Sequence, residues 1–120
     1  MQKKIRNVFE YKEYRLVLND DFVSRVSGNH SYSLRAYARD IQMSSGFISD
    51  VLRGKRDLSP TKARKTFEKL GFKQEELDYV ESLVVRKTSK DPARQQESLQ
   101  IIERLYRKPS FNNDVEKDLI

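Results

Sequence analysis

The segment 33–56, SLRAYARDIQMSSGFISDVLRGKR, constrains the fold of this chain more than any other stretch. Its first part carries apolar residues at the i, i+3, i+4 and i+7 spacing of one helix face, namely Leu34, Tyr37, Ala38 and Ile41. Ser33 is well placed as the N-cap of this helix. A serine-rich turn at about 42–45 leads to a second predicted helix over 45–53, which Gly54 ends. Two short helices joined by such a tight turn are typical of a helix-turn-helix.

The rest of the chain is also predicted to be helical, with no convincing strand. Apolar periodicity and turn residues place four further helices at about 11–27, 59–70, 74–87 and 93–108. Ser59 followed by Pro60 supplies an N-cap and a first-turn proline for one of them. We therefore expect an all-α fold with three parts: a helix-turn-helix domain over 1–88, a C-terminal helix within 89–108, and a flexible tail over 109–120.

Net positive charge gathers on the predicted helix-turn-helix. The whole chain carries a formal charge of +6. Residues 31–65 hold eight Lys and Arg against three Asp, a net of +5, so the remaining residues are close to neutral at +1. A surface that faces phosphates requires such a concentration of cations. The alternative is a solvated basic face that serves solubility.

Composition argues against several classes of protein. The chain has no cysteine, which excludes disulfides and thiolate metal sites and fits a cytoplasmic protein. No apolar run approaches the ~20 residues that span a membrane, and the basic start MQKKIR has no apolar segment behind it, unlike a secretory signal. The single histidine, His30, stands in a predicted loop, and the carboxylates show no paired layout. We expect no catalytic residues, no metal, no cofactor and no membrane partner.

A known family resembles this pattern. Residues 34–72 resemble the Cro/C1-type (XRE-like) helix-turn-helix, a five-helix all-α DNA-binding domain. The residues that carry the resemblance are Leu34, Tyr37, Ala38, Ile41, Ser44, Ile48, Ser49, Val51, Leu52, Gly54, Leu70 and Gly71.

A closer resemblance covers most of the first ninety residues. The stretches FEYKEYR (9–15), SLRAYARD (33–40), FISDVLRGKRDLS (47–59) and LDYVESLV (77–84) are similar to a paralogous family of predatory bacteria, whose members are described as transcriptional regulators. Longer members of that family carry a further C-terminal domain. The resemblance therefore implies either a short stand-alone member or part of a longer protein.

The resemblance also implies roles for individual residues. Ser44 would cap the helix over 45–53, and this helix would lie in the major groove of double-stranded DNA. The candidates for reading base edges are Ser45, Phe47, Ser49, Asp50 and Arg53, with Arg53 suited to a bidentate contact with guanine. The candidates for holding phosphates are Arg35, Arg39, Ser44, Lys55, Arg56, Ser59, Thr61 and Lys62.

Three residues of the motif are unusual for a DNA reader. Asp50 places a carboxylate where phosphates repel it, although an acid can accept a hydrogen bond from cytosine N4. Phe47 replaces a small or polar residue, and it is expected to pack on a thymine methyl or to complete the core. Gln42 stands where such turns commonly carry glycine, which matters only if that position needs a positive φ. A protein-interaction module with a Phe47-centred patch is therefore the alternative function.

The last predicted helix carries a second apolar stripe, formed by Leu99, Ile102, Leu105 and Tyr106. The stripe is too short for an independent coiled coil. It would either form the seam of a homodimer or fold back onto the helix over 74–87. A homodimer would place two recognition helices roughly 34 Å apart on DNA.

Overall fold

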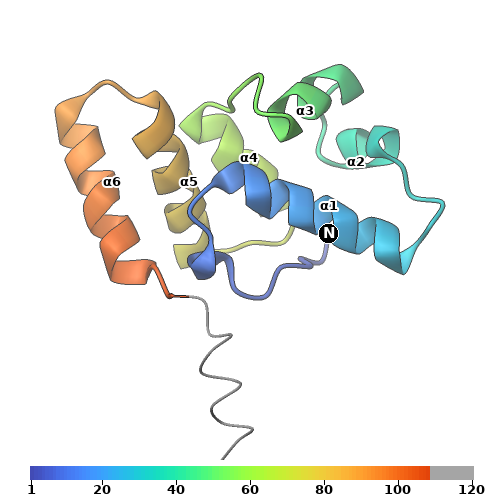
Figure 1. Cartoon of the computed structure of the whole chain (residues 1–120), viewed down its shortest axis with the longest axis horizontal. Helices are drawn as coiled ribbons and strands as arrows, with labels where there is room; N and C mark the ends of the chain where they lie inside the picture. The colour runs from blue at the N-terminus through green and yellow to red at the C-terminus, as the bar shows by residue number, and fades with distance from the viewer. Residues whose placement is uncertain (109–120) are drawn as a thin grey trace, which may run out of the picture.

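The computed structural model describes residues 1–108, which form one helical assembly without a strand (Figure 1). Its elements are the 3₁₀ helix η1 (Val8–Glu10) and the α-helices α1 (Tyr14–Gly28), α2 (Leu34–Asp40), α3 (Ser45–Leu52), α4 (Pro60–Lys69), α5 (Glu75–Thr88) and α6 (Pro92–Leu105). The predicted all-α class is confirmed. The tail predicted over 109–120 lies outside the described residues.

The serines predicted as N-caps begin their helices as expected. The Oγ atoms of Ser33, Ser44 and Ser59 each accept a hydrogen bond from the backbone N–H three residues further on, at 3.1, 3.1 and 3.2 Å. Each bond satisfies one of the N–H groups that have no partner within the helix. These caps fix where α2, α3 and α4 start.

The helix predicted over 11–27 begins later than its periodicity indicates. Tyr11 has the extended dihedrals φ −89° and ψ 144°, and it ends η1 rather than opening α1. Its carbonyl oxygen accepts a hydrogen bond from the Tyr79 hydroxyl of α5. This contact from a distant helix holds the segment before Tyr14 in an irregular conformation.

The last helix also differs from its predicted bounds, because it ends at Leu105 rather than near Lys108. Tyr106 leaves the helical region with φ −59° and ψ 136°. The next residue, Arg107, donates its backbone N–H to the carbonyl of Phe9 at 2.9 Å. A main-chain bond to η1 therefore replaces the last helical turn.

One hydrophobic core contains residues from every helix of the described chain. The inward faces of α2 and α3 are buried as predicted, with Tyr37, Ile48 and Val51 fully covered. α4 packs on α5 and α5 on α6, while α2 and α3 lie beside α1 at the opposite side of the molecule from α6 (Figure 1). The short helices α2 and α3 are thus held at one edge by a larger helical body.

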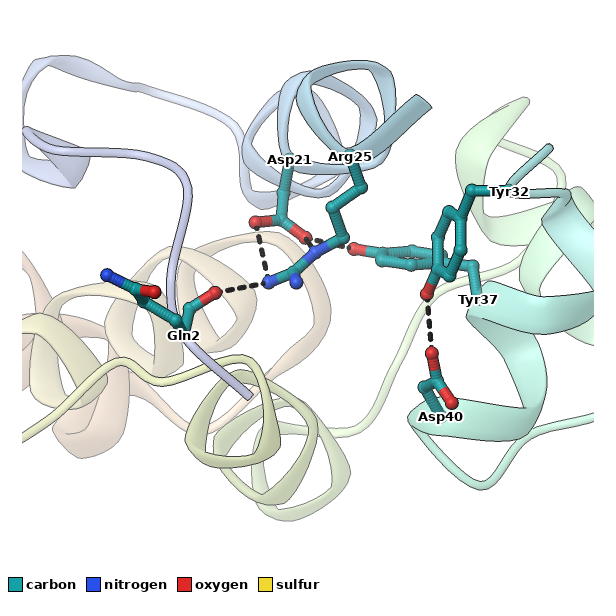
Figure 2. A network of polar contacts seen from close by, with 6 residues as sticks. All are labelled: Gln2, Asp21, Arg25, Tyr32, Tyr37 and Asp40. Atoms are coloured by element: carbon teal, nitrogen blue, oxygen red, sulfur yellow. Dashed lines mark hydrogen bonds and ion pairs between the residues drawn. The ribbon is translucent and has the colours of Figure 1, made fainter. Parts of the chain in front are cut away.

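A buried ion pair links α1 to α2 and to the N-terminal segment (Figure 2). Asp21 is fully buried, and its carboxylate accepts hydrogen bonds from the Arg25 guanidinium at 2.8 and 3.2 Å and from the Tyr37 hydroxyl at 2.8 Å. Arg25 also donates to the Gln2 carbonyl at 3.0 Å. Burial and the neighbouring Asp21 carboxylate raise the pKa of Tyr37, so this phenol stays protonated.

Three helices end in the same way, with one residue in the left-handed conformation. Gln42, Gly54 and Gly71 have φ of 59°, 78° and 98°. Each closes a pair of backbone bonds to the preceding helix, such as the bonds from Gln42 to the Arg39 carbonyl and from Met43 to the Ala38 carbonyl. Gly71 is required for a second reason, because a Cβ atom there would lie 2.6 Å from the backbone nitrogen of Lys3.

Candidate nucleic-acid interface

The helix α3 lies at an edge of the molecule (Figure 1). The side chain of Arg53 is exposed, whereas Ser45, Phe47, Ser49 and Asp50 are half-buried. Four of the five residues predicted to read base edges therefore lie on α3 and Arg53 directly follows it, and Arg53 alone of the five is exposed.

Asp50 holds two guanidinium groups. Its Oδ1 lies 3.1 Å from a nitrogen of Arg53 and its Oδ2 lies 3.3 Å from Nε of Arg56. The backbone carbonyl of Asp50 also accepts hydrogen bonds from the N–H groups of Lys55 and Arg56. The carboxylate is thus compensated by two cations, and its expected repulsion of phosphates is reduced.

Phe47 lies beneath Arg56 and a third cation, Lys62, instead of protruding. Its ring packs partly against the core. Its centroid is 4.4 Å from Nζ of Lys62 and 5.7 Å from the guanidinium carbon of Arg56, which are cation–π distances. We refer to the five linked residues as the α3 cationic cluster: Phe47, Asp50, Arg53, Arg56 and Lys62.

The predicted phosphate ligands are all accessible to solvent. Exposed side chains are found at every position predicted for this role: Arg35, Arg39, Ser44, Lys55, Arg56, Ser59, Thr61 and Lys62. Two of these cations have an acidic partner: Arg39 lies 3.9 Å from Asp40, and Arg56 is paired with Asp50. The structure places this set on α2, on the N-cap of α3 and around the loop that enters α4.

Two lysines of α4 belong beside this set but were missed from the sequence. Lys65 and Lys69 line a depression of about 320 Å³ together with Lys62, Thr61 and Gln42. The i, i+3 and i+7 spacing of the three lysines places them on one helix face. That spacing was the available signal, and it extends the basic surface along α4.

The loop between α3 and α4 is tied to α1 by buried polar contacts. The Tyr14 hydroxyl donates to Asp57 at 2.7 Å and accepts from the Leu58 N–H at 3.0 Å. Burial and the hydrogen bond to Asp57 raise the pKa of Tyr14. Arg15 donates to the carbonyl of Leu52, the last residue of α3, at 3.2 Å. The loop that carries Lys55 and Arg56 is therefore held in place by contacts with α1.

The residues predicted for a dimer seam lie on α6, or directly after it in the case of Tyr106, where α6 folds back along α5. Leu105 is buried in the common core. Leu99, Ile102 and Tyr106 are half-buried and line a groove between α6, α5 and the start of α1. The fold-back arrangement is thus the one observed within the chain, and the homodimer stays a prediction.

Among residues 1–108, no helix has the length and apolar character needed to cross a lipid bilayer. The same residues bring together no group of His, Cys, Asp or Glu side chains that would hold a metal ion. Comparisons with models of protein families, with curated proteins and with solved structures give no match.

Proposed function

We propose that this chain is a cytoplasmic DNA-binding transcriptional regulator with a Cro/C1-type helix-turn-helix, and that α3 enters the major groove of double-stranded DNA. The observation that carries the proposal is the α3 cationic cluster. It holds three cations and one carboxylate on and beside a short, exposed helix. Such a surface attracts phosphates and presents side chains to base edges at the same time.

The contacts of the cluster suggest a division of roles. Arg53 extends from the last turn of α3 and is oriented by Asp50, as a side chain that reads guanine must be. Arg56 and Lys62 are held over the Phe47 ring and suit backbone phosphates. Phe47 and Asp50 would then position cations more than they contact bases.

The position of Phe47 bears on the alternative function as a protein-interaction module. A protein-binding patch centred on this residue needs apolar area at the surface. The ring is instead packed against the core on one side and approached by cations on the other. The observations therefore favour DNA as the partner.

Selection of bound fragments from random double-stranded DNA, at moderate salt, tests the proposal directly. Folded protein should enrich a common sequence, and its affinity should fall steeply as salt rises. The logarithm of the binding constant, plotted against the logarithm of the salt concentration, should have a slope of about −0.9 per phosphate contact. Sedimentation of the full chain on the selected fragment would count the copies bound. Folded protein that enriches no sequence and binds without salt dependence would contradict the proposal.

Charge reversal assigns the binding to the proposed face. The triple variant Arg35→Glu, Arg39→Glu and Lys55→Glu should abolish binding to the selected fragment. The matched control is Arg6→Glu, Lys90→Glu and Arg94→Glu, which changes the net charge equally at exposed positions outside the proposed face. The control should retain most of the affinity, and equal losses in both variants would show that net charge alone is responsible.

A further inference from the structure

A groove of about 780 Å³ lies on another part of the molecule, where the start of α1 meets α5 and α6. Its apolar lining includes Tyr79 and Leu83 of α5, Leu99 and Ile102 of α6, and Tyr106, which directly follows α6. The volume falls in the range of about 300–1,000 Å³ that is usual for small-molecule sites. The apolar stripe of α6 thus faces a hollow within the chain.

The two buried tyrosines that line the groove have their hydroxyls engaged elsewhere. Tyr79 donates to the Tyr11 carbonyl and Tyr14 donates to Asp57. Burial raises the pKa of Tyr79 to about 12, so its phenol is neutral near pH 7. Both residues therefore offer the groove mainly their aromatic rings, which suits an apolar ligand.

The rim of the groove is predominantly cationic. It carries Lys12, Arg15, Arg86 and Lys87 against Glu13 and Glu103. Nζ of Lys12 lies 5.5 Å from the centroid of the Tyr106 ring, which belongs to the apolar wall of the groove. A ligand with an apolar body and a negatively charged end would match both the lining and the rim.

We infer that this groove binds a small amphipathic organic anion, of the acyl or aryl carboxylate class. The apolar body would lie along Leu83, Leu99 and Ile102, and the carboxylate would meet Lys12 and Lys87 at the rim.

The groove also touches the loop of the proposed DNA-binding face. Lys87 Nζ lies 3.1 Å from Oδ1 of Asp57, and Arg15 donates to the Leu52 carbonyl at the end of α3. A carboxylate beside Lys87 competes with Asp57 for its charge and loosens the loop that carries Lys55 and Arg56. Resting on the proposed function, the ligand therefore lowers the affinity for DNA.

Binding is tested first without DNA, on the full chain. Anilinonaphthalene sulfonate serves as the fluorescent probe and dodecanoate as the competitor. The dye should bind at one saturable site per chain, and dodecanoate should displace it, whereas dodecanol and dodecyltrimethylammonium should compete much less. An absence of saturable binding, or equal competition by the cationic analogue, would overturn the inference.

Variants locate the site. Lys12→Glu should weaken dodecanoate about fivefold, which is about 1 kcal/mol, while the equally charged Lys90→Glu leaves it unchanged. Ile102→Trp fills the groove and should abolish binding, with circular dichroism and a melting curve showing that the variant is folded. Unchanged binding in folded Ile102→Trp, or self-association that covers the groove in sedimentation, would overturn the inference.

The DNA measurement separates this inference from the proposed function. Dodecanoate should weaken binding of the selected DNA fragment several-fold in the parent chain and have no effect on Ile102→Trp. Saturable dodecanoate binding by a chain that binds no DNA would contradict the proposed function but support the groove. DNA binding by a chain that does not bind dodecanoate would support the proposed function and contradict the inference about the groove.

Discussion

At Gln42 the backbone adopts a conformation that glycine supplies at two equivalent places. The ends of α3 and α4 use Gly54 and Gly71 in the left-handed region, and the end of α2 uses a residue with a side chain. A left-handed conformation costs an L-residue roughly 1–2 kcal/mol. Because Gln42 has a positive φ, the strain that was predicted from the sequence only for that backbone conformation is present here.

We predict that Gln42→Gly stabilises the fold. Relief of the left-handed strain exceeds the added entropy of glycine in the unfolded chain, so the free energy of unfolding should rise by about 0.5–1 kcal/mol. Urea denaturation followed by circular dichroism measures the change. Gln100→Gly is the control, because Gln100 lies exposed inside α6, and it should lose about 1 kcal/mol. Losses in both variants would contradict the prediction.

At the scale of a single element, α3 balances attraction and repulsion through Asp50. We predict that Asp50→Asn tightens DNA binding at least about threefold and steepens its salt dependence, because Arg53 and Arg56 lose their internal anion while the amide oxygen of asparagine can still accept the hydrogen bond that orients Arg53. Glu97→Gln, at an exposed site of α6, makes the same change of charge and should have little effect. Binding isotherms over a salt series give both quantities. Weaker binding of the asparagine variant would mean that the carboxylate itself is needed at the DNA.

The elements also show which features were readable from the sequence. Periodicity and caps depend on neighbours within a few residues, and so Ser33, Ser44 and Ser59 were placed correctly. The late start of α1 depends on Tyr79, which lies 68 residues from Tyr11 in the chain. Contacts at that separation leave no periodic trace.

The candidate interface divides in the same way. The exposure of its phosphate ligands followed from their polar positions around α2, α3 and the loop into α4. Two contacts depend on the path of the loop after Gly54. They are the hydrogen bond from Arg56 to Asp50 and the position of Lys62 over the Phe47 ring. The path of such a loop is set by tertiary contacts, which local sequence does not specify.

At the scale of the whole molecule, the Asp21–Arg25 pair is the most costly polar feature to disturb. Removing one partner leaves a charge buried, and we predict that Arg25→Met lowers the free energy of unfolding by about 3–5 kcal/mol. Asp21→Asn combined with Arg25→Met should recover much of that loss, because no charge is then buried. Chemical denaturation at neutral pH compares the two. A single variant as stable as the exposed control Arg94→Met would contradict the prediction.

The buried phenols make the fold sensitive to alkali. Burial raises the pKa of Tyr37 and of Tyr14 above the unfolded value of about 10. The protonated form therefore contributes its full stability below pH ~10, and this contribution is lost as the pH rises toward the folded pKa. Melting curves from neutral to strongly alkaline pH should fall beyond that point, together with the appearance of tyrosinate absorbance. Tyr37→Phe should reduce the slope of the fall, and an unchanged slope would contradict the assignment.

The N-terminal segment makes several of its contacts with parts of the chain that are synthesised much later. Lys3 pairs with Glu76, the Tyr11 carbonyl binds Tyr79, and Phe9 receives the N–H of Arg107. During translation the first residues therefore leave the ribosome long before their partners, and closing such long loops carries an entropic cost. The helices between them can form earlier from local contacts. The segment made first is thus the last to reach its native position, and a nascent chain acquires its full stability only when α6 has emerged.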